Sequence, residues 1–178
     1  MKKLRMFMFT AAACLSVAPL LNSCQSDFTE NNIPVDNSGI AGTYRMSAFN
    51  IPVAVDYNAD GTTSTNLVNE SDCFVDNYIR LNSDHTYARI DNYIDLSSGI
   101  PTCAEFLETG VWKKEDNLIT TTSSAADGFN PYDTEITYDG SNVLTISYTN
   151  ADYPGVDGSG NPQTQQGDIS YVFTRSAE

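Results

Sequence analysis

The feature that most constrains the fold is a strict alternation of apolar and polar side chains in short runs. In the run VLTISYT, Leu144, Ile146 and Tyr148 share one face, while the residues between them are Thr or Ser. The last run behaves in the same way, with Ile169 and Tyr171 on one face. A period of two places successive side chains on opposite faces of a β-strand. The chain is therefore expected to fold as strands.

Similar runs recur along the chain and are joined by short polar connectors. The expected strands cover residues 43–50, 78–81, 86–94, 109–113, 118–122, 134–138, 143–149 and 169–174. Connectors such as NSDH, KEDN and DGSN have the length and composition of hairpin turns. Sustained helical periodicity is absent, although a short helical turn is expected at 102–106. About eight antiparallel strands predict an all-β sandwich or barrel, and we favour a single up-and-down barrel because closure removes exposed sheet edges.

The N-terminus has the architecture of a secretory signal. A basic head, MKKLR, precedes an apolar run of about 16 residues that ends in LLNSC, with the cysteine at position 24. The run contains Pro19 and is shorter than the roughly 20 residues needed to cross a hydrocarbon core. We therefore expect residues 1–23 to be a cleaved signal peptide.

Cys24 lies where bacterial lipoprotein signals carry their modified cysteine, with Leu21 at −3 and Ser23 at −1. The segment resembles such a signal, and the resemblance implies cleavage before Cys24 and acylation, with palmitate-type chains, that anchors the chain to a membrane. The alternative is an ordinary cleaved signal with an incidental cysteine. Asp27 and Glu30 loosely resemble the acidic export signals of some Gram-negative lipoproteins. We expect an outer-membrane lipoprotein of the cell envelope, periplasmic or surface-exposed.

The remainder divides into a tether and one domain. Residues 24–40 are polar and turn-rich, which predicts a flexible tether, and residues 41–178 have the size of a single domain with its own core. The formal net charge is −14, and removal of residues 1–23 leaves six basic against 23 acidic residues, a net charge of −17. Nucleic acid is not an expected partner, because phosphate binding needs a basic surface.

Several short motifs together resemble the lipocalin-like domain of bacterial lipoproteins. They are GTY at 42–44, ESDC at 70–73, YIRLNSDHTY at 78–87, Cys103, GVW at 110–112 and NLIT at 117–120. Tyr44 stands where this family commonly has Trp, and His85 stands where the turn often has Gly. The resemblance spans nearly the whole domain and implies a lipocalin-like barrel. It does not transfer a ligand, because one fold serves many functions.

The resemblance also bears on the cysteines. Cys14 leaves with the signal peptide, so if Cys24 is lipidated only Cys73 and Cys103 remain to pair in an oxidising compartment, and the family has paired cysteines at matching positions. A Cys73–Cys103 disulfide is therefore expected, and two free thiols are the alternative. A zinc site is disfavoured, because two cysteines and His85 do not fill a shell of four ligands.

The segment DYNADGT resembles the first half of a calcium loop. Asp56, Asn58 and Asp60 occupy positions 1, 3 and 5, glycine follows at 6, and the carbonyl of Thr62 falls at 7. Position 12 is Leu67 in place of a carboxylate, so Glu70 or Asp72 would have to replace it. The alternative is an Asx-rich turn between strands that needs no ion. A second acidic segment, 152–168, lacks regular ligand spacing and is expected to be a loop at the barrel rim.

Catalytic motifs are not evident. His85 is the sole histidine and lies in a predicted turn, no G-x-S-x-G elbow surrounds a serine, and no phosphate-binding glycine loop opens a helix. Carboxylates are numerous, but their abundance indicates mostly solvated surface. We expect no enzymatic activity, and no cofactor apart from the calcium left open above.

Aromatic residues give the remaining indication of function. An eight-stranded barrel is either filled by side chains or holds one small ligand. The residues expected to line such a cavity are Tyr44, Trp112, Tyr148, Tyr171 and Phe173, with Ala48 as a small inward residue. Tyrosine hydroxyls among apolar walls suit a small hydrophobic or amphipathic ligand. The alternative function is a structural module with a solid barrel, stabilised by calcium, that meets an envelope protein or glycan.

Overall fold

The computed structural model describes residues 39–124 and 130–177. The expected signal peptide, Cys24 and most of the tether lie outside the described residues. Within the described ranges, no helix is both long and apolar enough to cross a membrane.

Nine strands and two single-turn 3-10 helices make up the described chain. The strands are β1 (Gly42–Val55), β2 (Ser64–Asn66), β3 (Tyr78–Leu81), β4 (Thr86–Asp95), β5 (Thr102–Glu115), β6 (Leu118–Ser123), β7 (Asp133–Tyr138), β8 (Val143–Val156) and β9 (Pro162–Arg175). The helical turns are η1 (Leu67–Asn69) and η2 (Asp72–Phe74), between β2 and β3.

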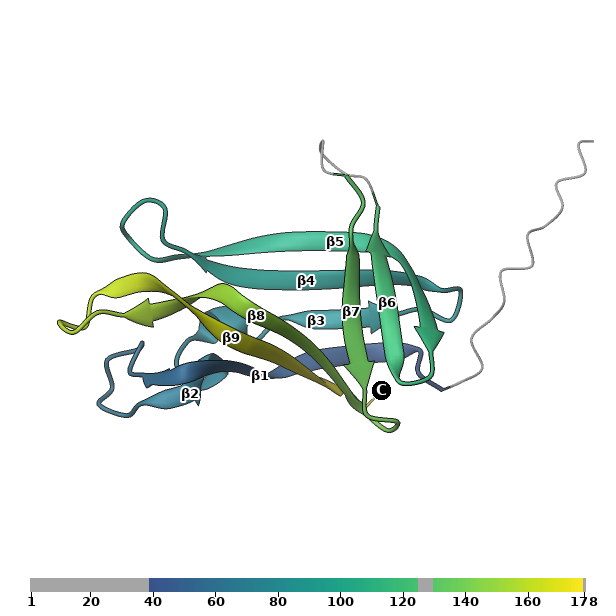
Figure 1. The fold of residues 1–178 in the computed structure, drawn as a ribbon, viewed down its shortest axis with the longest axis horizontal. Helices are drawn as coiled ribbons and strands as arrows, with labels where there is room; N and C mark the ends of the chain where they lie inside the picture. Colours follow the sequence, from purple (N-terminus) through teal and green to yellow (C-terminus); the bar gives the residue numbers. More distant parts are fainter. Residues whose placement is uncertain (1–38, 125–129, 178) are drawn as a thin grey trace, which may run out of the picture. The chain divides into compact units, whose positions relative to one another are not determined.

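The strands form one closed antiparallel sheet. Each strand from β3 to β8 pairs with the next in sequence, β1 pairs with β3, and β9 returns to β1, while β2 adds a short strand at the side of β1 (Figure 1). Without β2 the ring has eight strands in up-and-down order. The prediction of an all-β, eight-stranded up-and-down barrel is therefore confirmed.

A bulge in β1 changes which of its residues face inward. Tyr44 and Met46 are buried, but the register against β9 shifts between Met46 and Ala48, and Phe49 becomes the next buried residue. Ala48 pairs with Val172, which alternates with the inward residues of β9. An extra residue in one strand moves every later side chain of that strand to the face opposite the one that strict alternation predicts. The expectation that Ala48 faces inward is therefore wrong.

Two segments are more regular than the sequence suggested. The expected helical turn at 102–106 is the start of β5, paired with the end of β4. The expected rim loop at 152–168 is mostly the outer part of the β8–β9 hairpin, whose turn is confined to 157–161. Both corrections lengthen hairpins at the same end of the barrel.

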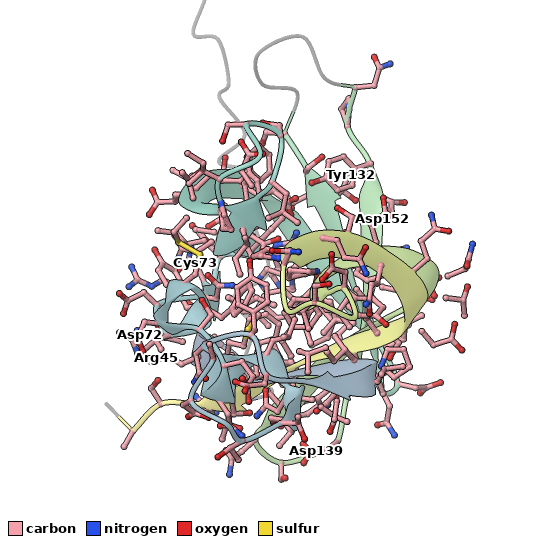
Figure 2. The ribbon with its side chains drawn as sticks, turned by 90° about the vertical axis from the view of Figure 1, so that its left-hand side faces the viewer. Arg45, Asp72, Cys73, Tyr132, Asp139 and Asp152 are labelled. Carbon is pink, nitrogen blue, oxygen red and sulfur yellow. A yellow bond between two sulfur atoms is a disulfide. The ribbon has the colours of Figure 1, made fainter. Side chains whose placement is uncertain are left out.

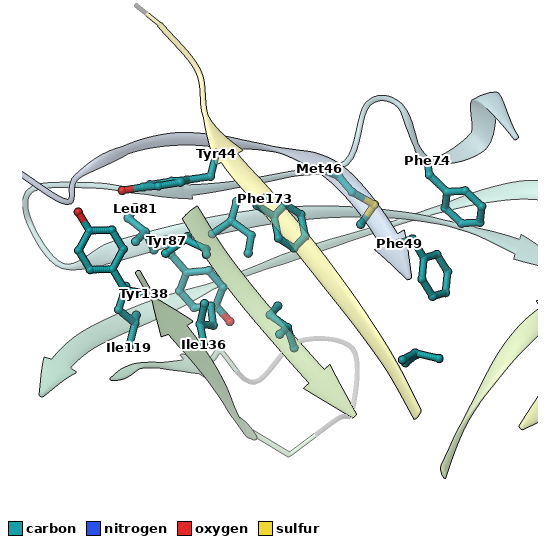
Figure 3. Close-up of a cluster of buried hydrophobic side chains, with 14 of the residues drawn as sticks. Tyr44, Met46, Phe49, Phe74, Leu81, Tyr87, Ile119, Ile136, Tyr138 and Phe173 are labelled. Atoms are coloured by element: carbon teal, nitrogen blue, oxygen red, sulfur yellow. The ribbon is translucent and has the colours of Figure 1, made fainter. Parts of the chain in front are cut away.

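The apolar core lies toward one end, which we call the closed end. Six fully buried residues from five strands meet there, and Figure 3 shows Tyr44, Leu81, Ile119 and Ile136 among them gathered together. They are Tyr44, Ile79, Leu81, Ile119, Ile136 and Leu144. The Tyr44 hydroxyl donates to the Ile40 carbonyl over 2.7 Å, so its one polar atom is satisfied in the core. The closed end is therefore solid.

Candidate functional site

The other end of the barrel, the open end, is formed by hairpins that separate. Residues 102–108 of β5 have no ladder partner on their β6 side within the described chain, because β6 pairs only with Gly110–Glu115. Likewise β8 pairs with β7 only through Leu144 and Thr145. The β4–β5 and β8–β9 hairpins therefore continue past β6 and β7 as separate arms (Figure 1).

A cavity of about 490 Å³ opens between these arms. Its wall is built from the end of β4 and the turn after it, from both strands of the β8–β9 hairpin, from β1 and from η2. Small-molecule sites typically measure about 300–1,000 Å³. The size and position of this cavity make it the candidate functional site.

Aromatic rings form much of the cavity wall. Phe49 of β1 lies between Phe74 of η2 and Tyr171 of β9, with ring centroids 5.2 and 4.5 Å apart respectively. Tyr93 and Tyr153 also line the cavity, from β4 and β8. Phe49 and Phe74 are buried, which fixes the inner part of the wall, and Tyr93 is 45% exposed at the mouth. The site therefore offers apolar ring faces at several depths.

Carboxylates supply the charge of the cavity. Asp91, Asp95 and Asp152 line it, and its described lining includes no lysine, arginine or histidine. Asp95 accepts the backbone N–H of Ser97 over 2.8 Å, which lowers the pKa of its carboxyl, and Asp152 accepts from the Gln166 side chain over 2.8 Å. Both hydrogen bonds hold the carboxylates in place at the rim.

A buried polar layer lies below the cavity and begins at Asp91. Arg89 and Glu108 are cross-strand neighbours on β4 and β5. The Arg89 guanidinium is 3.1 Å from Asp91 Oδ2 and 4.0 Å from Glu108 Oε2. Burial disfavours the charge on Arg89, but the two carboxylates raise its pKa above the ordinary value. Burial also raises the pKa of Asp91, and Arg89 partly offsets that rise.

Two tyrosines complete the polar layer around Glu108, which is only 4% exposed. The Tyr87 hydroxyl donates to Glu108 Oε1 over 2.5 Å, and the Tyr132 hydroxyl donates to Glu108 Oε2. Burial and these bonds raise the pKa of Tyr132 to about 12 and raise that of Tyr87 further, so both phenols stay protonated donors. Arg89 Nε is buried without a partner. The layer therefore has one donor left over.

A disulfide holds η2 to the tip of the β4–β5 hairpin. Cys73 and Cys103 are bonded, with their Cα atoms 5.6 Å apart, as predicted. Phe74 follows Cys73 directly, and Cys103 pairs across the strands with Ile94, so both partners adjoin residues that line the cavity. Figure 2 views this end and shows the disulfide at Cys73 and Asp152 on opposite sides of the barrel. The bond therefore fixes one wall of the mouth.

The five residues predicted to line a ligand cavity lie in different places. Tyr44, Trp112 and Phe173 are buried in the core, and the Trp112 indole N–H donates to the Asn82 carbonyl while its ring stacks on His85. Tyr171 lines the cavity, and Tyr148 reaches it indirectly through an edge contact with Tyr171, with centroids 6.0 Å apart. The structure therefore brings together Tyr148 and Tyr171.

The predicted calcium loop is a compact turn held by its own side chains. Asp56 accepts the backbone N–H groups of Asp60 and Gly61, each over 3.0 Å, and Asp60 accepts that of Thr62 over 2.7 Å. Asn58 also accepts from Asp60. Glu70 is buried and accepts the backbone N–H of Tyr57 over 2.9 Å, so it lies at the base of this loop.

These bonds are those of an Asx-rich turn, the alternative considered above. Within residues 39–124 and 130–177, no group of three or more His, Cys, Asp or Glu side chains is placed to hold a metal ion. Asn58 and the Thr62 carbonyl are ligands of other types, so calcium at this loop stays a prediction.

Sequence reasoning missed the residues at the centre of the site. One face of β4 carries Tyr87, Arg89 and Asp91, which alternate along the strand. In β5, Glu108 lies on the same inward face as the buried Trp112. Charged residues at inward positions were the available signal. They were passed over because polar residues in alternating strands normally face solvent.

No protein-family model, curated protein or solved structure matches this chain. The barrel architecture is consistent with the lipocalin-like resemblance seen in the short sequence motifs.

Proposed function

We propose that this protein is a non-enzymatic lipoprotein of the cell envelope, related to the lipocalin-like domains, whose barrel binds a small amphipathic ligand at its open end. The observation that carries the proposal is the cavity of about 490 Å³, with aromatic walls and carboxylates at its rim. Apolar walls with a few placed polar groups are typical of small-molecule sites. The signal-like segment before Cys24 supports the envelope location and the lipid anchor.

The chemistry of the buried layer favours binding over catalysis. Each Glu108 carboxylate oxygen accepts a hydrogen bond from a tyrosine hydroxyl, and the Asp91 carboxylate is paired with Arg89. A general base needs a free lone pair aimed at the substrate, and a nucleophile needs such a base beside it. The charged groups of the layer are instead paired with one another, apart from Arg89 Nε, and they form the floor below the cavity.

A second function is favoured by one specific observation. Leu107 and Val111 of β5 are 58% and 56% exposed, and Ile100 before that strand is 70% exposed. Leu107 and Val111 share one face of β5, and exposed apolar side chains that share a face are typical of contact surfaces. The alternative function is therefore an interaction module whose outer β5 face meets an envelope protein or glycan.

Native mass spectrometry of the protein isolated from its own host without chelator tests the primary function. We expect an organic mass increment that survives EDTA, whereas a calcium increment at the 56–62 loop would be lost. Thr164→Trp places a large ring at the cavity wall and should remove the organic increment. Thr137→Trp, on the exposed outer face of β7, is the matched control and should keep it.

A bare polypeptide mass from the native host would refute a bound small ligand. An increment that persists in Thr164→Trp would place the ligand elsewhere. Either result would turn attention to the outer face of β5.

A further inference from the structure

We infer that the cavity selects ligands that carry a positive charge on an apolar or aromatic body, such as primary amines. This inference rests on the proposed small-ligand function and names the ligand class. It depends on three observations: the cavity itself, the aromatic rings in its wall, and the negative charge of the carboxylates that line it. The three observations are independent of one another.

The charge of the cavity has one sign. Asp91, Asp95 and Asp152 come from two separate strands, and no described lining residue is basic. The nearest cation described in the polar layer is Arg89, which already lies between Asp91 and Glu108. Even with Arg89 included, the mouth and floor together carry four carboxylates against one guanidinium. An anionic ligand would therefore be repelled at the rim.

The aromatic walls add a second attraction for a cation. The face of an aromatic ring is electronegative, and a cation within about 6 Å of the ring centroid is attracted to it. Phe49, Tyr153 and Tyr171 line the cavity together with the carboxylates. Their rings also give apolar contact area for the body of the ligand. A ligand with both a cationic group and an apolar body matches both parts of the wall.

The two rim carboxylates are suited to a charge-only test. In Asp95→Asn the side-chain oxygen still accepts the Ser97 N–H, and in Asp152→Asn it still accepts from Gln166. The shape and hydrogen bonds of the rim therefore stay while two charges leave. Asp116→Asn is the matched control, because Asp116 is exposed in the turn between β5 and β6 at the closed end, with φ at 54°, a conformation that Asn also tolerates.

The experiment is an NMR titration of the isotope-labelled purified protein with three probes that share a phenyl ring and a short chain. The probes are 2-phenylethylamine, 2-phenylethanol and 3-phenylpropionate, which are cationic, neutral and anionic at pH 7. We expect the amine to bind about tenfold more tightly than the alcohol and the propionate to bind most weakly, with shifts at the cavity residues. The preference should shrink at high salt, because the rim is partly solvated.

The Asp95→Asn/Asp152→Asn double variant should bind the amine no better than the alcohol, while its affinity for the alcohol stays unchanged. Asp116→Asn should keep the full preference. Equal binding of amine and alcohol by the wild type would overturn the cation inference and leave the small-ligand function standing. A preference that persists in the double variant, or tighter binding of the propionate, would also overturn the inference. Failure of all three probes to bind would overturn both.

Discussion

The two ends of this barrel differ in how their interiors are filled. At the closed end neighbouring strands are paired and fully buried apolar side chains fill the interior, as at Leu144 and Ile119. At the open end the hairpins separate and the interior is lined by rings and carboxylates around a cavity. Between the ends lies the polar layer of Arg89 and Glu108.

The difference indicates where stability and where binding reside. A close-packed apolar core, whose tyrosine and tryptophan polar atoms are hydrogen-bonded, contributes most of the free energy of folding, and a loss of side-chain volume there lowers it. A wall around a cavity makes fewer contacts, so its shape needs extra constraints. The disulfide at Cys73 and the paired charges of the polar layer supply those constraints. Three experiments test this division.

The largest effect is expected at the closed end. Leu144 is fully buried between β7 and β9, and Leu144→Ala should lower the free energy of unfolding by about 4 kcal/mol, because it removes apolar contact and leaves a void. Urea denaturation measures the loss. The affinity for 2-phenylethylamine should stay at the wild-type value under conditions where the variant is folded. A parallel loss of affinity would show that the two ends are energetically coupled.

Removal of the disulfide at the open end should cost somewhat less stability than Leu144→Ala. Cys73→Ser with Cys103→Ser should cost about 3 kcal/mol, because the unfolded chain regains the freedom of the loop that the bond closes. Here the amine affinity should fall as well, since η2 and Phe74 are no longer tied to β5. Affinity and denaturation are measured on the same sample. Unchanged affinity would mean that packing alone holds this wall.

The smallest effect concerns the turns, where the two ends should behave alike. At the closed end, N–H groups of Val143 and Ser141 lower the pKa of Asp139 to about 2, and at the open end Asn161 and Ser159 lower that of Asp157. A lowered pKa stabilises the fold above the unfolded value, and this contribution is lost as the pH falls through the folded value.

The stability advantage of the wild type over Asp139→Asn should therefore shrink between about pH 4 and pH 2. Asp157→Asn should show the same sign. Urea midpoints measured across this range provide the test. An advantage that grows on acidification would contradict the role assigned to these turns.

Alternation was sufficient to predict the strands because every barrel strand has one face inside. It identified Leu144, Ile146, Ile169 and Tyr171 on their correct faces. It failed at Ala48, because a bulge reverses the parity without a sequence signal such as glycine. Residues 102–106 and the outer β8–β9 hairpin were missed for a related reason. Both belong to arms that are mostly exposed on their two faces, so apolar and polar residues do not alternate regularly there.

The candidate site was harder to predict, because its shape depends on which strands stop pairing. Tyr171 was identified from its inward face, but Tyr44 and Trp112 share that property and lie in the core. Position along the barrel separates them, and it follows from the short ladder between β7 and β8. The disulfide was predictable, since only two cysteines remain once Cys14 is assigned to the expected signal peptide and Cys24 to the expected lipid anchor.

The start of the first strand and the end of the last strand meet at the closed end, opposite the mouth of the cavity. Both Arg175 Nη atoms donate to carbonyls at the entry of the chain, those of Gly39 and Ala41, so the barrel begins and finishes at one pole. A protein held through its N-terminal segment is held at that pole. The mouth is at the other pole, so with the proposed N-terminal lipid anchor we expect a ligand to reach it from the surrounding fluid.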